Sequence, residues 1–104
     1  MSNLKLGSGF ARVEKMLSMG INVAVGTDGV ASNNNFNLLE DLRFASIMHN
    51  PANEFPDVIN PVNLMKMGTI NGAKAQGRDD CGQIKVGNKA DFAVCARKFN
   101  CACY

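Results

Sequence analysis

The sequence contains no tryptophan, one tyrosine, one histidine and three prolines among its 104 residues. An excess of charge of one sign is also missing, since 11 basic and 9 acidic side chains leave a formal net charge of +2. This balance, without a basic cluster or interleaved aromatics, argues against a nucleic-acid partner. No run of about 18 apolar residues exists, so we expect no membrane-spanning helix. The N-terminal residues lack a basic region followed by an apolar core, so we expect no secretory signal and a cytoplasmic location.

The composition is that of a globular chain, with 46% hydrophobic and 19% charged residues. It excludes an intrinsically disordered protein, and the length fits one domain. Cysteines stand at positions 81, 95, 101 and 103, a spacing that matches no zinc finger or ribbon. Without a secretory signal, reduced thiols are expected. The terminal Cys-Ala-Cys pair supplies only half of a tetrahedral zinc site.

Hydrophobic spacing predicts alternating strands and helices in the first part of the chain. Residues 1–8 are expected to be a strand end and loop, followed by a helix over 9–19 with apolar residues at helical spacing. Gly20 occupies the position of a C-terminal glycine cap. The next six residues, 21–26, alternate as a strand does, and their β-branched side chains share one face. These are Ile21, Val23 and Val25.

The rest of the chain predicts two more helices and a β-hairpin. Asn37 is expected to cap a helix that ends at Pro51, and a loop over 50–60 follows. A second helix starts at Asn60-Pro61 and continues to about Ala75, because a cap residue followed by proline favours a helix start. Residues 82–96 read as two short strands about a turn at Gly87-Asn88. Methionines on the predicted helices are expected to fill the core. They are Met16, Met19, Met65 and Met67.

Asp28 is the leading candidate for chemistry. It follows the predicted strand 21–26, and α/β enzymes place catalytic groups at the carboxyl ends of their strands. Gly26 and Gly29 leave space around it for a ligand or a metal. The alternative is that Asp28 only shapes the loop, as Asp-Gly pairs commonly do.

Other polar groups give weaker signals. The amides of residues 32–35 (Ser-Asn-Asn-Asn) suit hydrogen bonds to a polar substrate in a small-molecule-binding α/β module, or an ordered turn. Calcium is excluded in its EF-hand form because the residues after Asp28 lack alternating oxygen ligands. Gly7 and Gly9 suggest a phosphate loop only weakly, since no Walker motif follows. His49, the single histidine, is expected to be a surface cap at a helix C-terminus.

Several motifs together resemble the last barrel units of the amidohydrolase superfamily. They are SNLKLGSGFARV, MLSMGINVAVGTDGVASNNN, NLLEDLRFAS, MGTINGAKAQG and GQIKVGNKADFAV. The branch that they resemble most comprises the methylthioadenosine/S-adenosylhomocysteine deaminases and related aminohydrolases and chlorohydrolases. The resemblance covers about residues 2–95 and keeps the order of the motifs.

The resemblance implies an α/β fold. Residues 1–80 would form the last two βα units of a TIM-barrel-type amidohydrolase and the following helix. Residues 81–104 would supply a short β-hairpin of the small β-domain and a tail that diverges from the family. Arg12 stands where the family usually has proline, which affects a helix start. The barrel would be incomplete.

The resemblance also implies a chemistry, hydrolytic deamination or dechlorination of a nitrogen heterocycle with zinc or iron. Asp28 matches the aspartate after the eighth strand, which touches the metal and carries a proton from metal-bound water to the leaving group. Ser32 and, more weakly, Asn3 match positions that face the substrate.

The single histidine separates family resemblance from catalytic competence. The family holds its metal with a His-x-His pair and two further histidines in segments that this chain does not contain, and His49 matches none of them. One carboxylate does not hold zinc, which needs about three protein ligands. We therefore expect a fragment without bound metal that is inactive alone, with Asp28 a metal ligand only if another chain supplies the histidines.

The alternative is a non-catalytic remnant that acts, if at all, through self-association or partner binding. Two barrel strands leave unpaired edges and apolar faces. We expect the chain to cover them as a homo-oligomer, a dimer with exchanged strands or joined sheets.

Overall fold

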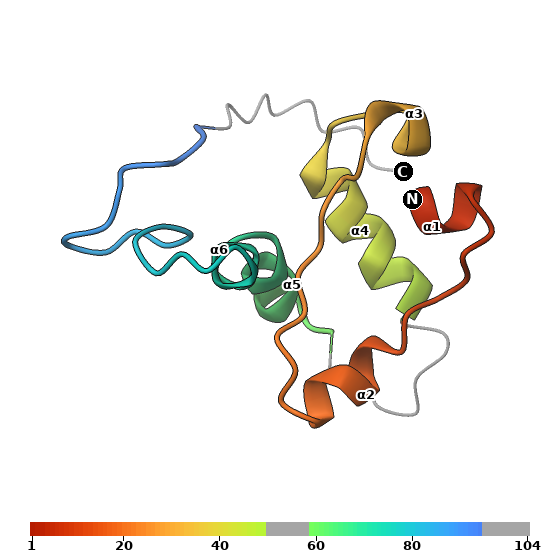
Figure 1. Ribbon diagram of the computed structural model, residues 1–104, viewed down its shortest axis with the longest axis horizontal. Coiled ribbons are helices and arrows are strands. Elements are labelled where there is room, and N and C mark those ends of the chain that lie inside the picture. The colour runs from red at the N-terminus through yellow and green to blue at the C-terminus, as the bar shows by residue number, and fades with distance from the viewer. Residues whose placement is uncertain (50–58, 95–104) are drawn as a thin grey trace, which may run out of the picture.

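The computed structural model describes residues 1–49 and 59–94, and within them the chain forms helices and irregular segments (Figure 1). The helices are α1 (Ser2–Lys5), α2 (Val13–Ser18), α3 (Val30–Asn33), α4 (Leu38–His49), α5 (Pro61–Gly68) and α6 (Ile70–Ala75). Helix α4 packs against α5, α5 against α6, and α1 against α3. No helix in the described ranges is long and apolar enough to cross a bilayer.

The core lies between α2, α4 and α5. Its buried cluster is joined by half-buried side chains from the segment between α2 and α3. The cluster is Val13, Ile59, Leu64 and Met67, with Leu17, Val23, Val25 and Ala45 packed on it. Met67 is 2% exposed, as predicted for a core methionine, whereas Met19 at 66% and Met65 at 49% are not core residues. Met19 lies outside the core because α2 ends just before it.

The predicted strand end over residues 1–8 is wrong, because residues 2–5 form α1. The carbonyl of Met1 accepts hydrogen bonds from the amides of Leu4 and Lys5, so the backbone satisfies itself within one turn. A strand here needs a neighbouring strand. None is present within 1–49 and 59–94.

The predicted helix over 9–19 forms as the shorter α2. Gly9 has φ +78°, which is outside the helical region, so the helix cannot begin there. The predicted cap at Gly20 is confirmed, with φ +72°. The amide of Gly20 donates to Leu17 O and that of Ile21 donates to Met16 O, the two hydrogen bonds of a Schellman motif.

The predicted strand over 21–26 has no ladder, and its alternation is present only over residues 22–26, since Ile21 is 46% exposed and does not share the face of Val23 and Val25. Val23 and Val25 are half-buried, whereas Asn22, Ala24 and Gly26 are exposed. The segment crosses the middle of the molecule past α5 (Figure 1). The prediction fails at pairing, because a ladder needs a second strand and the described residues contain only helices and irregular chain beside this segment.

Both predicted helices of the second half are present. The one expected from Asn60 to about Ala75 is divided into α5 and α6. Asn37 caps α4 by accepting a hydrogen bond from Glu40 N at 3.3 Å, although the Glu40 side chain bonds Asn35 and so does not close a capping box. Asn60 caps α5 by accepting from Asn63 N at 2.9 Å. At Thr69 the backbone leaves helical geometry, with φ −128° and ψ −93°, which separates α5 from α6.

The end of α5 lies close to α4 at Gly68. A Cβ added to Gly68 would lie 2.9 Å from Leu42 Cδ1, so glycine lets the end of α5 approach α4. The predicted loop over 50–60 falls outside the described residues except for its last two, and three of the cysteines also lie outside. They are Cys95, Cys101 and Cys103.

The predicted β-hairpin over 82–96 is not formed in its described part, residues 82–94. A turn is present, closed by a hydrogen bond from Asn88 N to Lys85 O, but no strands pair around it. Ile84 and Val86 are 96% and 99% exposed. An isolated two-stranded hairpin is marginal in water unless a further strand or helix covers its apolar face.

Candidate functional site

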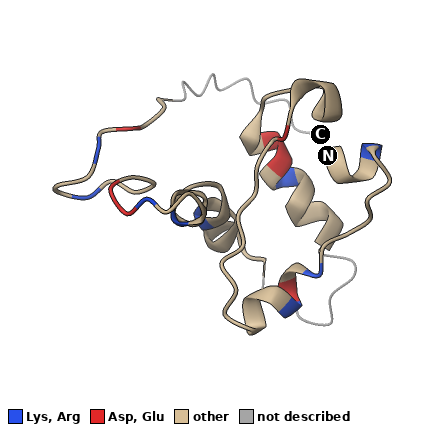
Figure 2. Ribbon diagram, viewed as in Figure 1, with Lys and Arg blue, Asp and Glu red and all other residues tan. Residues whose placement is uncertain are grey.

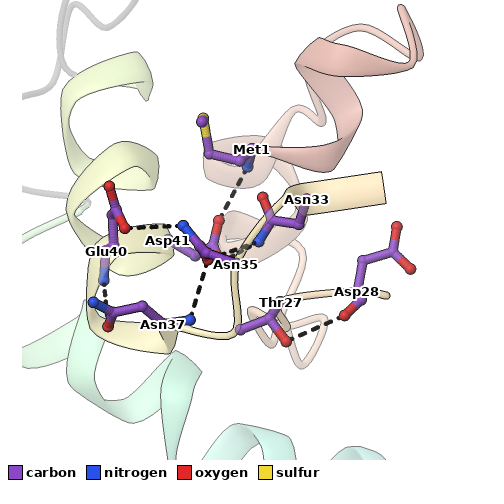
Figure 3. Close-up of polar contacts among 8 residues, drawn as sticks. All are labelled: Met1, Thr27, Asp28, Asn33, Asn35, Asn37, Glu40 and Asp41. Atoms are coloured by element: carbon purple, nitrogen blue, oxygen red, sulfur yellow. Dashed lines mark hydrogen bonds and ion pairs between the residues drawn. The ribbon is translucent and has the colours of Figure 1, made fainter. Parts of the chain in front are cut away.

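Asp28 stands at the end of the extended segment, in a backbone conformation unusual for a side chain. Its φ is +61°, in the left-handed region. Its Oδ1 accepts a 2.7 Å hydrogen bond from Gly29 N, and its carbonyl accepts from Thr27 Oγ1 at 3.3 Å. The carboxylate is exposed and points away from the neighbouring polar cluster (Figure 3). The geometry therefore agrees with the turn-forming role and also leaves the second carboxylate oxygen open.

The residues after Asp28 form an ordered loop around a buried polar pair. Asn33 Nδ2 donates a 2.7 Å hydrogen bond to Asp41 Oδ2, and the two residues are 2% and 4% exposed. The α-amino group of Met1 donates to Asp41 Oδ1 at 3.2 Å (Figure 3). Asn35 connects the same loop to Glu40 at 2.9 Å. The asparagine run is thus an ordered turn, and Asn33 and Asp41 are residues that sequence patterns did not single out.

Lys5 joins α1 to α3, which brings the elements of the two predicted substrate contacts together. Its Nζ donates to Ala31 O at 2.8 Å and to Asn34 Oδ1 at 2.6 Å. Asn3 is exposed on α1, and Ser32 is half-buried on α3. Within the described ranges neither side chain makes a hydrogen bond, so both are open to a ligand. The role of Lys5 could not be predicted from the sequence, because its hydrogen-bond partners are a carbonyl and a side-chain amide far along the chain.

His49 lies at the other end of α4 from this loop. Its Nδ1 is 3.7 Å from Glu14 Oε1, and its side chain is 15% exposed, so it is not the surface cap that was predicted. The Glu14 side chain on α2 lies beside it. Helix α4 has 12 residues and is about 18 Å long, which separates His49 from the Asp28 loop at the other end.

A cavity of about 280 Å³ lies between the extended segment, α4 and α5. Its wall is mostly apolar, with Asn3, Asp41 and His49 among the polar lining residues. Asp28 is not part of the wall. The cavity therefore occupies the core side of the extended segment, and the candidate carboxylate lies outside it.

A group of charges that is distant from Asp28 in sequence lies at the start of segment 82–94. Asp80 Oδ2 lies 2.8 Å from Lys89 Nζ, and Asp80 Oδ1 lies 3.1 Å from Arg78 Nε. The hydrogen bonds from Lys89 and Arg78 lower the pKa of Asp80 to about 2. The same carboxylate raises the pKa of Arg78. These charges follow α6 in Figure 2, and they fix the start of the segment.

The described residues do not form a complete metal site. Within residues 1–49 and 59–94 no three His, Cys, Asp or Glu side chains gather in one place. Asp28 is a single carboxylate, and the histidine lies at the far end of α4. A tightly held catalytic zinc needs about three protein ligands.

Comparisons with known proteins find relatives that match most of this chain. The 5-methylthioadenosine/S-adenosylhomocysteine deaminase of Acetivibrio thermocellus is 52% identical over 94 residues, covering 89% of this chain and 22% of that enzyme. The 5'-deoxyadenosine deaminase of Methanosarcina barkeri is 48% identical over 93 residues, with 89% and 21% covered. The chain therefore spans about a fifth of the length of the curated relatives it matches.

The fold has a counterpart among solved structures. An adenosine deaminase from Xanthomonas campestris, solved with bound zinc, superposes with a TM-score of 0.80 at 36% identity, over 86% of this chain and 21% of the other. The model of the amidohydrolase family matches residues 1–103. From its first helix to its last described segment, this chain belongs to the amidohydrolase family.

Proposed function

We propose that this chain forms the Asp28-bearing part of a deaminase acting on adenine nucleosides. The observation that carries the proposal is the position of Asp28 directly after a segment with the alternating burial of a strand. Its side chain is exposed, and its backbone has a left-handed conformation. Strained backbone at a polar residue is typical of functional sites. The relatives are named as deaminases of 5-methylthioadenosine and S-adenosylhomocysteine, of 5'-deoxyadenosine and of adenosine, and these names support an adenine nucleoside as the substrate.

In this proposal the chain corresponds to the last two βα units of the TIM-barrel-type fold. Residues 1–80 belong to the barrel, and 81–104 belong to a small β-domain. The alternation of Val23 and Val25 with Ala24 supports a barrel strand at 21–26. The exposure of Ile84 and Val86 supports a hairpin that needs a larger sheet to form.

Asp28 carries the proton in this reaction. Water adds to the ring carbon that bears the amino group, ammonia leaves, and a carboxylate beside both is suited to take a proton from the water and return it to the nitrogen. Ser32 and Asn3 contact the substrate, and the Lys5 contacts to Ala31 and Asn34 hold their two helices together.

The chain alone is expected to be inactive. Zinc or iron would use Asp28 only where another chain supplies the histidine ligands. This part of the proposal follows from the donor set, one exposed carboxylate with no second or third ligand gathered near it in the described residues.

A chimera tests the catalytic assignment. In the Acetivibrio thermocellus deaminase, the matched 22% is replaced by this chain, and deamination of 5'-methylthioadenosine is followed by ultraviolet absorbance. We expect an active chimera and a loss of about 100-fold or more in kcat for Asp28→Asn. A folded chimera that binds zinc without turnover, or one that Asp28→Asn leaves unchanged, contradicts the proposal.

The second candidate is a non-catalytic, self-associating protein in the cytoplasm. It is favoured by the apolar side chains of segment 82–94, of which Val86 and Val94 are 99% and 89% exposed. Large exposed apolar patches mark association surfaces. Light scattering over a wide concentration range tests it. A concentration-dependent dimer supports this candidate, and a monomer throughout contradicts it.

A further inference from the structure

Hydrogen bonds connect Asp28 to helix α4 through Asn33. The Asp28 Oδ1 atom accepts from Gly29 N at 2.7 Å, and the carbonyl of Gly29 accepts from Asn33 N at 3.0 Å. The side chain of Asn33 donates from Nδ2 to Asp41 Oδ2 at 2.7 Å (Figure 3). All three distances are those of well-formed hydrogen bonds. The exposed carboxylate of Asp28 is thus connected to a buried carboxylate on α4.

The two ends of this connection differ in how firmly they are held. Asp41 is 4% exposed and lies on α4, which has 12 residues and packs against α5. Asp28 is exposed, and its φ of +61° lies in the left-handed region, which is unfavourable for a residue with a Cβ. Such a conformation persists where the surrounding structure holds it. The position of Asp28 therefore depends on the contacts of the loop that follows it.

Asn33 has a buried oxygen atom that a role in stability alone does not explain. Its Oδ1 is buried and has no hydrogen-bond partner within residues 1–49 and 59–94. An unpaired buried acceptor costs free energy, so asparagine is a poor choice here for stability alone. Its Nδ2 group, in contrast, reaches Asp41 on the neighbouring helix. The side chain is therefore better suited to fixing the geometry of the loop than to stabilising the fold.

Lys5 holds the same loop, but through contacts that are open to solvent. Its Nζ donates to Ala31 O at 2.8 Å and to Asn34 Oδ1 at 2.6 Å. Both of these bonds are exposed, whereas the bond between Asn33 and Asp41 is buried. A hydrogen bond in the interior of a protein is electrostatically stronger than one in water. The contact of Asn33 is therefore the stronger of the two.

We infer that Asn33 is a positioning residue for the Asp28 carboxylate, which it holds through Gly29 while Asp41 holds Asn33 in place. The inference rests on the proposed function, in which Asp28 moves a proton from water to the leaving nitrogen. A carboxylate can do this when its oxygen lies within hydrogen-bond reach of both groups. Because Oδ1 is bonded to Gly29 N, Oδ2 is the oxygen available for the proton. Displacement of this oxygen by about 1 Å is enough to slow a reaction by about 100-fold.

The first test uses the full chain and does not depend on activity. Scalar couplings between Hα and Hβ of Asp28, measured by NMR, report whether its carboxylate occupies one side-chain rotamer or several. We expect single-rotamer couplings in the parent and averaged couplings in Asn33→Ala. Asn60→Ala is the matched control, since it also removes an asparagine hydrogen bond, the one from Asn63 N at the start of α5, and should leave the Asp28 couplings unchanged. Asn33→Ser, whose side chain is too short to reach Asp41, takes the place of Asn33→Ala if that variant does not fold.

The second test measures kcat and KM in the chimera of this chain with the Acetivibrio thermocellus deaminase. Asn33→Ala should lower kcat about 100-fold and change KM by less than about threefold, because it displaces Asp28 and removes no substrate contact. Asp41→Asn retains an acceptor oxygen for Asn33 and should keep kcat within about threefold of the parent. Asp41→Leu leaves no acceptor and should lower kcat as Asn33→Ala does. Asn60→Ala should change neither constant.

The outcomes separate this inference from the proposed function. Equal Asp28 couplings in Asn33→Ala and the parent overturn the inference, and so does a kcat that Asp41→Leu leaves unchanged. An active chimera that Asp28→Asn inactivates and Asn33→Ala does not supports the proposed function and overturns the inference. A chimera that binds zinc without turnover, together with couplings that Asn33→Ala averages, supports the positioning role of Asn33 and contradicts the proposed function.

Discussion

Asn33 on α3 donates a 2.7 Å hydrogen bond to the carboxylate of Asp41 on α4, and both residues are almost completely buried. A buried carboxylate costs free energy unless it is paired and hydrogen-bonded. Here Asn33 and the α-amino group of Met1 provide those bonds. This contact fixes the loop that follows Asp28 against α4.

Replacing Asp41 should therefore destabilise the chain. Asp41→Ala leaves the buried amide of Asn33 without its acceptor, which should lower the free energy of unfolding by about 1–3 kcal/mol. Urea unfolding followed by circular dichroism measures it. The control is Asp79→Ala at an exposed aspartate. Equal midpoints for the two variants would contradict a structural role for the pair.

Two substitutions at Asp28 distinguish the effect of its backbone conformation on stability from the effect of its charge. Asparagine tolerates a positive φ, so Asp28→Asn should stay within about 0.5 kcal/mol of the parent. Asp28→Ala should lose about 1 kcal/mol, because a left-handed alanine is strained. Thermal unfolding of the two variants checks this order. If Asp28→Asn were the less stable variant, the carboxylate itself would be stabilising the loop.

Gly82 holds segment 82–94 against α6. Its φ is +82°, and an added Cβ would lie 3.0 Å from Ile70 Cα and Thr69 O. Gly82→Ala should therefore release the segment at a cost of about 1–3 kcal/mol. Hydrogen exchange of Lys89 N, which donates to Asp80 O at 2.8 Å, should accelerate. Gly29→Ala, at φ −76° with no atom near the added Cβ, should leave that exchange unchanged.

The ion pairs of Asp80 should make the stability of this part of the chain depend on pH under acid conditions. The pKa of Asp80 is lowered from 3.8 to about 2 by hydrogen bonds from Lys89 and Arg78. A lowered pKa means that the stabilisation is complete above the ordinary value and is lost as the pH falls through about 2. Carbon-13 carboxyl shifts should titrate with a midpoint near 2. Lys89→Ala should raise the midpoint, and Lys85→Ala should not move it.

Local features were predictable from sequence, and long-range pairings were not. Gly20 and Asn60 cap their helices as expected, because a cap depends on residues within one turn. The alternation of Val23 with Ala24 was also visible. The strand itself did not form, because pairing depends on a neighbour that the described residues do not contain.

The candidate site was predictable in the same partial way. Asp28 could be named from its place after a strand pattern. Asn33, by contrast, is one of three consecutive asparagines, and only the tertiary fold decides which of them turns inward to Asp41. His49 was expected at the surface, and packing against Glu14 on α2 made it half-buried. Nothing in the sequence spacing links residues that far apart.

Zinc content and deaminase activity of the purified chain alone test the central claim most directly. The proposal is that this chain carries the Asp28 part of an amidohydrolase site and that its described residues lack the further ligands that a tightly held zinc needs. Dialysis against zinc, followed by elemental analysis and an assay with 5'-methylthioadenosine, should give no stoichiometric zinc and no turnover. One zinc per chain, with deamination that Asp28→Asn abolishes, would contradict the claim.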